Sequence, residues 1–271
     1  MATTTRYLDL PDGRLAYDET GDPSGPLVIC SPGLGDLRST FDRLAAALAA
    51  DGARVVTTDL RGHGESSAGW PDYSVAAVAG DLVALAGHLG GHAVLVGNSY
   101  SGSAAVVAAA RAPEAGIVLT GAFVRDHPPG LATRPQIALL RSPVLGRRLW
   151  TSLAWPSFFG KDKPADFAAR KAELTRSLRE PGRYAAVAAM MKPGRHRATE
   201  PLLGDVRVPA LVVMGTADPD FPDPAAEARF TADALGGDAT VLLLDGVGHY
   251  PQTEAPELVA PAVAEFVRKH A

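Results

Sequence analysis

The chain has 271 residues, of which 46% are apolar and 21% are charged. These values are typical of a folded globular protein and argue against disorder, and the length fits one large α/β domain or a domain with an insertion. The net charge of −4 gives no electrostatic reason to expect nucleic acid or a membrane as a partner, and the apolar stretches are too short for a transmembrane helix.

The N-terminal segment and the cysteine content both predict a cytoplasmic protein. Residues 1–10 contain Arg6 and Asp9 and lack the apolar core of a signal peptide. The single cysteine, Cys30, cannot form an internal disulfide, which fits a reducing compartment. It lies in the apolar run 27–30, so we expect an inert core residue there.

Short apolar or β-branched runs alternate with helical patterns along most of the chain, which predicts a mostly parallel sheet with helices on both faces. The expected strands cover residues 6–10, 14–18, 26–31, 54–58, 92–97, 116–123, 210–214 and 240–244. The expected helices cover residues 41–50, 74–89, 99–111, 225–235 and 257–269.

The pattern changes between residues 125 and 205, where no clear strand is found. Helical pieces are expected at 166–178 and 183–191, interleaved with Pro, Arg and aromatic residues. We therefore predict that residues 126–205 form a helical cap, or lid, inserted into a core made of residues 1–125 and 206–271.

Ser99 lies between an expected strand and an expected helix, in the segment Gly97-Asn98-Ser99-Tyr100-Ser101-Gly102. A nucleophilic serine needs such a sharp turn, with small residues two positions before and after it. Gly97 meets this need, whereas Ser101 stands where glycine is usual. A serine at a strand–helix junction is also a common N-cap, so Ser99 alone leaves both roles open.

Four motifs together resemble the α/β-hydrolase family. The segment 97–102 is similar to its nucleophile elbow, and residues 59–66 (DLRGHGES) are similar to its loop after the fourth strand. Residues 215–218 (GTAD) resemble its acid turn, and residues 246–249 (GVGH), with Glu254, resemble its histidine loop. The motifs occur in the chain order of that family.

The resemblance implies an eight-stranded α/β-hydrolase sheet and a triad of Ser99, Asp218 and His249. A serine hydroxyl needs a base, and His249 follows the expected strand 240–244 through a glycine-bearing loop that lets the imidazole reach the sheet edge. The imidazole in turn needs an acid to orient it, and Asp218 follows the strand 210–214. Asp220, Asp223 and the more remote Asp126 are rivals for that role.

The oxyanion hole is expected to use the backbone amides of Leu34 and Tyr100. The family usually has His-Gly where this chain has Pro32-Gly33, so the support of that loop is in question. His63, within the second motif, is expected to brace a loop.

These residues and the resemblance together predict a serine esterase or lactonase that acts through an acyl-enzyme. The alternatives are a C–C bond hydrolase acting on a β-diketone-type substrate and a non-catalytic small-molecule-binding homologue. Serine at position 99 argues against the dehalogenase and epoxide-hydrolase relatives, which carry aspartate there. No residue spacing suggests a metal site, and Gly33-Leu34-Gly35 does not complete a dinucleotide loop, so no cofactor is expected.

The expected partner is a small, mostly apolar substrate, and the expected assembly is a monomer or small homo-oligomer. Aromatic and methionine residues in the cap could line a pocket over the site, although most are expected to form the cap's own core. The arginines of residues 195–197 are expected on a solvated face.

Overall fold

The computed structural model describes residues 4–112, 114–127 and 134–271. Its described residues form one sheet of eight strands in the order β1-β2-β4-β3-β5-β6-β7-β8. The strands are β1 (Arg6–Leu10), β2 (Gly13–Gly21), β3 (Leu27–Ser31), β4 (Arg54–Thr58), β5 (Val94–Asn98), β6 (Gly116–Thr120), β7 (Ala210–Gly215) and β8 (Ala239–Leu244). β1 and β2 pair antiparallel, as do β2 and β4, and the other pairs are parallel. The predicted mostly parallel sheet is confirmed.

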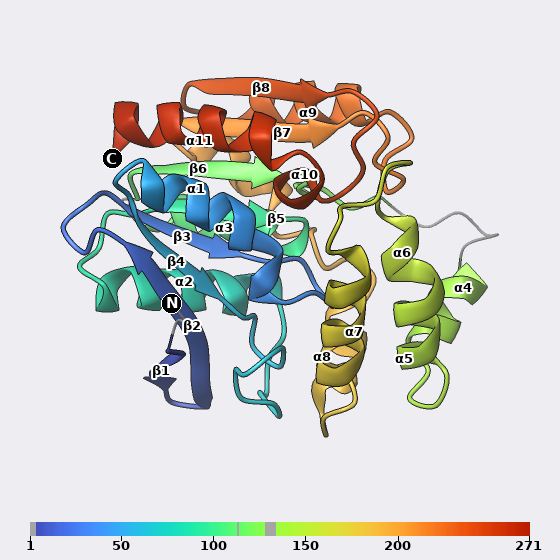
Figure 1. Cartoon of the computed structure of the whole chain (residues 1–271). Helices are drawn as coiled ribbons and strands as arrows, with labels where there is room; N and C mark the ends of the chain where they lie inside the picture. The colour runs from blue at the N-terminus through green and yellow to red at the C-terminus, as the bar shows by residue number, and fades with distance from the viewer. Residues whose placement is uncertain (1–3, 113, 128–133) are drawn as a thin grey trace.

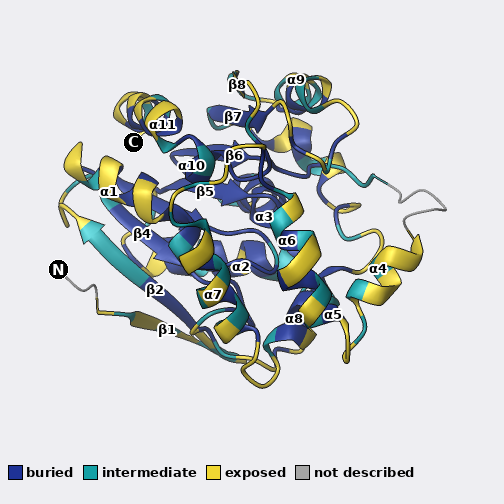
Figure 2. Cartoon of the chain, turned by 45° about the vertical axis from the view of Figure 1, so that its right-hand side comes forward, coloured by how far each residue is buried: buried dark blue, intermediate teal, exposed yellow. Residues whose placement is uncertain are grey.

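Helices cover both faces of the sheet. They are α1 (Asp42–Ala50), α2 (Val75–His88), α3 (Tyr100–Ala109), α9 (Pro224–Ala234), α10 (Pro251–Glu254) and α11 (Pro256–His270). α1 and α11 pack on one face through residues such as Leu44 and Val263, and α2, α3 and α9 pack on the other. The central strands β3, β5 and β6 are buried along their whole length, as parallel strands between two helical layers must be (Figure 2).

Several element boundaries differ from expectation by a few residues, and two of them have a clear local cause. The strand predicted to reach residue 123 ends at Thr120, because Gly121 adopts a left-handed backbone with φ of 52° that turns the chain out of the extended conformation. The helix predicted from residue 41 begins at Asp42, after a 3-10 turn η1 (Arg38–Phe41). The predicted cap of α2 is confirmed, since the Ser74 side chain accepts a hydrogen bond from the Ala77 amide.

The segment between β6 and β7 contains helices and no strand in its described part, residues 126–127 and 134–205. Its helices are α4 (Arg134–Leu140), α5 (Gly146–Leu149), α6 (Trp155–Ser157), α7 (Phe167–Ser177) and α8 (Arg183–Met190), with a π-helical turn η2 (Trp150–Ala154) and a 3-10 turn η3 (Glu200–Asp205). α4 to α8 lie beyond the ends to which the arrows of β6 and β7 point (Figure 1). This places them over the edge of the sheet where ligands bind in open α/β folds.

The large apolar side chains of this segment divide between two roles. Most of them pack with one another or in the main core: Trp155, Phe159, Phe167, Tyr184 and Met190. Trp150, Phe158 and Met191 also line a cavity at the sheet edge. Most of these residues do form a cluster of buried side chains, but it includes Leu37 and Tyr250 from outside the segment, so it is not the segment's own core as expected.

Candidate active site

Ser99 lies in a strained turn between β5 and α3. Its backbone has φ of 53° and ψ of −113°, a left-handed conformation that is rare for any residue except glycine and is typical of functional sites. Ser99 precedes α3 at the N-cap position, but its side chain makes no capping hydrogen bond. The N-cap role that the sequence left open is therefore not the one that the side chain performs.

Close backbone packing at this turn explains its glycines. A Cβ on Gly97 would lie 2.4 Å from the carbonyl oxygen of Ser101, and a Cβ on Gly102 would lie 2.3 Å from the Cβ of Ala122. Both distances are far below van der Waals contact. The turn therefore requires glycine at these two positions.

We expect Gly97→Ala to destabilise the fold by about 1–3 kcal/mol, because the added methyl must push apart the two backbones of the turn. Urea denaturation followed by circular dichroism would measure this. The matched control is Gly80→Ala on the exposed face of α2, where nothing lies within 4 Å of the new methyl. The free energy of unfolding of this control should rise by about 0.5–1 kcal/mol, because alanine is favoured over glycine within a helix. Equal effects of the two variants would contradict the packing argument.

The two departures from the family pattern, Ser101 and Pro32, contact each other. The Ser101 hydroxyl donates a hydrogen bond of 2.5 Å to the Pro32 carbonyl, and the Ser31 hydroxyl lies 2.9 Å from the Ser101 Oγ. A glycine at position 101 could not make these bonds. The serine therefore supplies a brace to the loop after β3.

The next residues of that loop are held from two further sides. His63 is fully buried, and burial lowers its pKa to about 4, so its ring is neutral. Its Nε2 accepts a hydrogen bond of 2.9 Å from the Gly35 amide, and its Nδ1 donates to the Arg61 carbonyl at 3.1 Å. Trp150 Nε1 donates to the Gly35 carbonyl at 2.9 Å. His63 has the loop-bracing contact that was expected of it.

The loop runs directly beside Ser99. A Cβ on Gly33 would lie 3.0 Å from the Ser99 Cβ and 3.5 Å from its Oγ. The amides of Leu34 and Tyr100 donate no hydrogen bond to another described residue. Two N–H groups without a described partner therefore belong to the segments on either side of the serine, one to this loop and one to the start of α3.

His249 follows β8 and is joined to Asp218, which follows β7. Its Nδ1 donates a hydrogen bond of 2.7 Å to Asp218 Oδ2, and both side chains are almost completely buried. Burial lowers the pKa of His249, but the charges of Asp218 and Asp220 outweigh it and raise the pKa to about 9. The free imidazole therefore holds a proton firmly.

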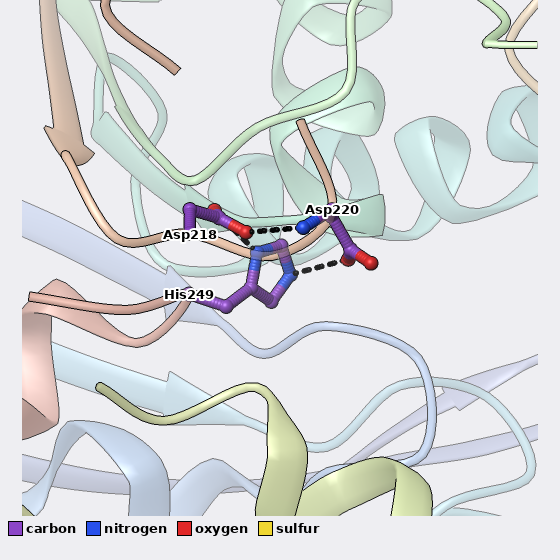
Figure 3. Close-up of side chains that lie close together, drawn as sticks. All are labelled: Asp218, Asp220 and His249. Atoms are coloured by element: carbon purple, nitrogen blue, oxygen red, sulfur yellow. Dashed lines mark hydrogen bonds and ion pairs between the residues drawn. The ribbon is translucent and has the colours of Figure 1, made fainter. Parts of the chain in front are cut away.

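Asp220 lies on the opposite side of the imidazole ring. Figure 3 shows His249 between the two carboxylates, with Nε2 facing Asp220 Oδ2 at 3.6 Å. The Asp220 amide also donates to Asp218 Oδ1 at 3.0 Å, which ties the two residues together. Burial raises the pKa of Asp220. Among the hydrogen bonds of the described residues, none joins His249 to Ser99.

The other two rivals for the acid role lie elsewhere. The Asp223 side chain caps α9 by accepting from the Ala226 amide at 2.9 Å. Asp126 Oδ1 accepts from the backbone amide of His196 at 3.0 Å. Neither carboxylate contacts His249, whereas Asp218 and Asp220 both do.

Sequence reasoning missed one residue that organises the site. Asn98 is fully buried, and its Nδ2 donates to the carbonyls of Thr120 at 2.8 Å and His249 at 3.1 Å. It thereby ties the serine turn to the histidine loop. Its polar side chain at the end of a buried apolar strand was the available signal.

Glu254, which belongs to the histidine-loop motif, stabilises that loop through hydrogen bonds from backbone amides. Its Oε2 accepts from the Gly160 amide at 2.7 Å and the Gly248 amide at 3.1 Å, and its Oε1 accepts from the Tyr250 amide at 3.1 Å. One carboxylate thus fixes both the histidine loop and the inserted segment.

A cavity of about 720 Å³ opens above Ser99 and His249. Its volume suits a small organic ligand. Its lining is mostly apolar and comes largely from the inserted segment, with Leu140, Leu149, Trp150, Phe158 and Met191. Charged side chains also line it, namely Arg195 and Asp220.

The expectation that the arginines of residues 195–197 lie on a solvated face was wrong in part. Arg197 is exposed, but Arg195 is partly buried and lines the cavity, and His196 is only 2% exposed. The chain turns inward after α8, so that adjacent residues face opposite environments.

Asp218, Asp220 and His249 could also offer ligand atoms to a metal ion, since these atoms lie within 4.8 Å of one another. However, the 2.7 Å contact between Nδ1 and Asp218 Oδ2 is the length of a hydrogen bond, and a metal at Nδ1 would have to displace that proton. The hydrogen-bonded arrangement accounts for the geometry without an ion.

Two further predictions from the sequence concern Cys30 and membrane-spanning helices. Cys30 is fully buried, and burial raises its pKa far above the usual range, as suits an inert thiol. In the part of the chain that is described, no helix combines the length and the apolar character needed to cross a membrane.

Comparisons with known proteins agree with this architecture. The model of the alpha/beta hydrolase family matches residues 27–262. The chain is 27% identical to a 2-(acetamidomethylene)succinate hydrolase of Mesorhizobium japonicum, over 97% of this chain and 95% of that protein. It is 26% identical to epoxide hydrolase A of Mycobacterium tuberculosis, over 98% of both chains. A thermophilic esterase from Thermogutta terrifontis superposes with a TM-score of 0.81 and 27% identity, over 99% of this chain and 100% of that one.

Proposed function

Since this chain belongs to the alpha/beta hydrolase family, we propose that it is a serine hydrolase that cleaves a carboxylic ester or lactone through an acyl-enzyme. The observation that carries the proposal is the strained turn that presents Ser99 to the same cavity as His249, whose other nitrogen is bonded to Asp218. Ser99 is the nucleophile in this reaction, His249 is its base, and Asp218 orients the base.

The reaction follows from these groups. Ser99 Oγ attacks the carbonyl carbon of the substrate, and its proton passes to His249 Nε2. The C–O bond to the leaving alcohol breaks, and the alcohol takes the proton from the imidazolium. Water then attacks the acyl-enzyme with His249 again as base, which releases the acid and restores Ser99. Asp218 keeps the proton on Nδ1 and stabilises the cation.

The free amides of Leu34 and Tyr100 are the donors for the oxyanion that forms on the substrate. Such preorganised donors contribute strongly, since loss of one typically costs about 10²–10³ in turnover. The braces on the loop after β3, from Ser101, His63 and Trp150, keep the Leu34 amide in place.

One rearrangement is part of this proposal. Nε2 must receive the Ser99 proton, but in the free protein it faces Asp220. The imidazole therefore exchanges its contact with Asp220 for one with Ser99 when substrate enters. Catalytic hydrogen bonds are often loose before substrate binds, so this exchange is an ordinary requirement.

The substrate is a small molecule with a mostly apolar acyl or alcohol part, which matches the apolar lining of the cavity. In this proposal residues 126–205 act as a cap over residues 1–125 and 206–271. Although a relative is an epoxide hydrolase, the serine at position 99 favours ester chemistry, because the family resemblance implies aspartate at that position in epoxide hydrolases.

A fluorophosphonate probe tests the proposal. We expect the folded protein to be labelled at Ser99, because the probe reacts with serines that a neighbouring base activates. Peptide mass analysis would locate the label, and Ser99→Ala and His249→Ala should abolish it. Heat-denatured protein is the control and should stay unlabelled. A folded protein that takes up no label would favour the non-catalytic binding homologue instead.

A further inference from the structure

The cavity above Ser99 contains one cationic side chain among the described residues that line it other than His249, and this is Arg195. It projects from the loop that follows α8 in an otherwise mostly apolar lining. Burial lowers the pKa of its guanidinium, which shows that the charge lies in a poorly solvated place. An arginine in such a position needs a structural or a functional reason.

A chain of hydrogen bonds anchors one side of this guanidinium. Arg195 Nε donates to His196 Nε2 at 2.9 Å, and His196 Nδ1 lies 2.7 Å from Ser103 Oγ. Burial lowers the pKa of His196 to about 2, so its ring is neutral. Because Nε2 accepts, Nδ1 carries the proton and donates to Ser103, whose hydroxyl then donates to the Phe123 carbonyl.

The His196 ring is itself held on several sides. It stacks on Phe123, with ring centroids 5.2 Å apart and planes 14° apart, and it meets Tyr100 edge-on at 5.6 Å. Its backbone amide donates to Asp126 at 3.0 Å. The position of Arg195 Nε is therefore set by α3 and by the chain just after β6, both of which also frame Ser99.

The terminal nitrogens on the other side of the guanidinium are unpaired in the described residues, and the contact of the group there is with the face of the Phe123 ring, whose centroid lies 5.9 Å from Cζ. In the described part of the chain, the terminal nitrogens of Arg195 make no hydrogen bond and no ion pair within 4.0 Å. Asp220, the carboxylate that shares the cavity, directs its Oδ2 at His249 instead (Figure 3). The charges of Asp220 and Asp126 attract the guanidinium from a distance, but in the described residues neither pairs with it. A partly buried cation without an ion-pair partner is costly, and its planar pair of terminal nitrogens matches the two oxygens of a carboxylate.

We propose that Arg195 binds a carboxylate group of the substrate, so that the preferred substrate is a mostly apolar ester or lactone that carries one carboxylate. Arg195 thereby determines specificity, and His196 is the residue that positions it. The inference rests on the proposed hydrolase function and narrows its substrate class.

The first test compares two esters that differ only in that group, mono-p-nitrophenyl glutarate and its methyl ester. We expect the wild type to have the higher kcat/KM for the free acid. Arg195→Met should reduce that preference by about 10–100-fold, mostly through KM, because the variant cannot form the hydrogen-bonded charge pair with the carboxylate. The loss of kcat/KM on the neutral methyl ester should be clearly smaller than the loss on the free acid, because that ester has no carboxylate for Arg195 to bind, and Arg195→Lys should restore part of the preference as a point charge.

The matched control is Arg197→Met, two positions further along the chain. Arg195 lies between the cavity above Ser99 and a neighbouring cavity of about 580 Å³ and lines both, whereas Arg197 is exposed and lines only the neighbouring one. This variant should behave as the wild type on both esters. A preference for the acid that is equal in wild type and Arg195→Met, or absent in both, would overturn the proposal.

A binding measurement separates this proposal from the proposed chemistry. Calorimetry with monomethyl glutarate, which has no activated ester, should give a Kd that is about tenfold or more weaker for Arg195→Met than for wild type and Arg197→Met. If neither nitrophenyl ester is cleaved but this difference in Kd is found, the hydrolase function fails and the carboxylate site stands. Equal affinities, or no binding to any of the three proteins, would overturn the site.

Discussion

Replacing Ser99 with alanine is expected to lower kcat on a p-nitrophenyl ester by about 10⁴–10⁶-fold, and His249→Ala should do the same. The reason is that nucleophile and base act as a unit: without the imidazole the hydroxyl is not activated, and without the hydroxyl the imidazole has nothing to activate. The double variant should therefore be only slightly worse than either single one. Steady-state kinetics with the same ester would measure all three.

Circular dichroism and thermal melts provide the control for this series. Ser99 holds a left-handed backbone that alanine would hold with similar strain, so the Ser99→Ala protein should fold with an unchanged spectrum. If the losses of the two single variants multiplied in the double variant, Ser99 and His249 would be acting independently. That outcome would contradict the triad.

Asp218→Asn is expected to lower kcat by about 10⁴-fold, whereas Asp220→Asn should cost far less. Asp218 accepts the Nδ1 proton at 2.7 Å and so keeps Nε2 available for the Ser99 proton, a role that an amide performs poorly because it can itself donate. Asp220 faces Nε2 at 3.6 Å, where it competes with Ser99 instead of supporting it. A larger loss from Asp220→Asn would assign the acid role to Asp220.

The pH dependence of kcat/KM tests the roles of Asp218 and Asp220 in a second way. His249 must be neutral to act as a base, and its pKa is raised to about 9 by Asp218 and Asp220 against the opposing effect of burial. The wild-type kcat/KM should therefore rise with pH until about 9. Asp220→Asn removes one of the two negative charges, which lowers the pKa of His249, so the rising limb should shift to lower pH. An unshifted limb would show that Asp220 does not act on His249.

Much of the architecture could be predicted from the sequence because its signals are local. Runs such as Leu27–Ser31 and Gly116–Thr120 are buried on both faces, so they are continuously apolar and easy to recognise. Parallel strands all present their carboxyl ends to one edge, so the positions of Ser99, Asp218 and His249 after three strands predicted their proximity. The helices α4 to α6 were missed because they are short and interrupted.

Three features of the site were decided only by the tertiary structure. The Ser101 hydroxyl braces Pro32 across 69 residues of sequence, so each departure from the family pattern has its explanation in the other. Asp220 faces the wrong nitrogen of His249 to replace Asp218, although both follow β7.

The third feature is Arg195. It belongs to an arginine-rich segment that is typical of an exposed surface, but it lines the cavity because His196 is anchored against Ser103 and Phe123. The sequence by itself determined the sheet, the order of its strands along the chain and the residues that meet at its edge, because periodicity and turn chemistry are encoded in neighbouring residues. Which carboxylate faces which nitrogen, and which arginine lines the cavity, depends on side-chain directions set by contacts between distant segments. Those contacts exist only once the chain has folded.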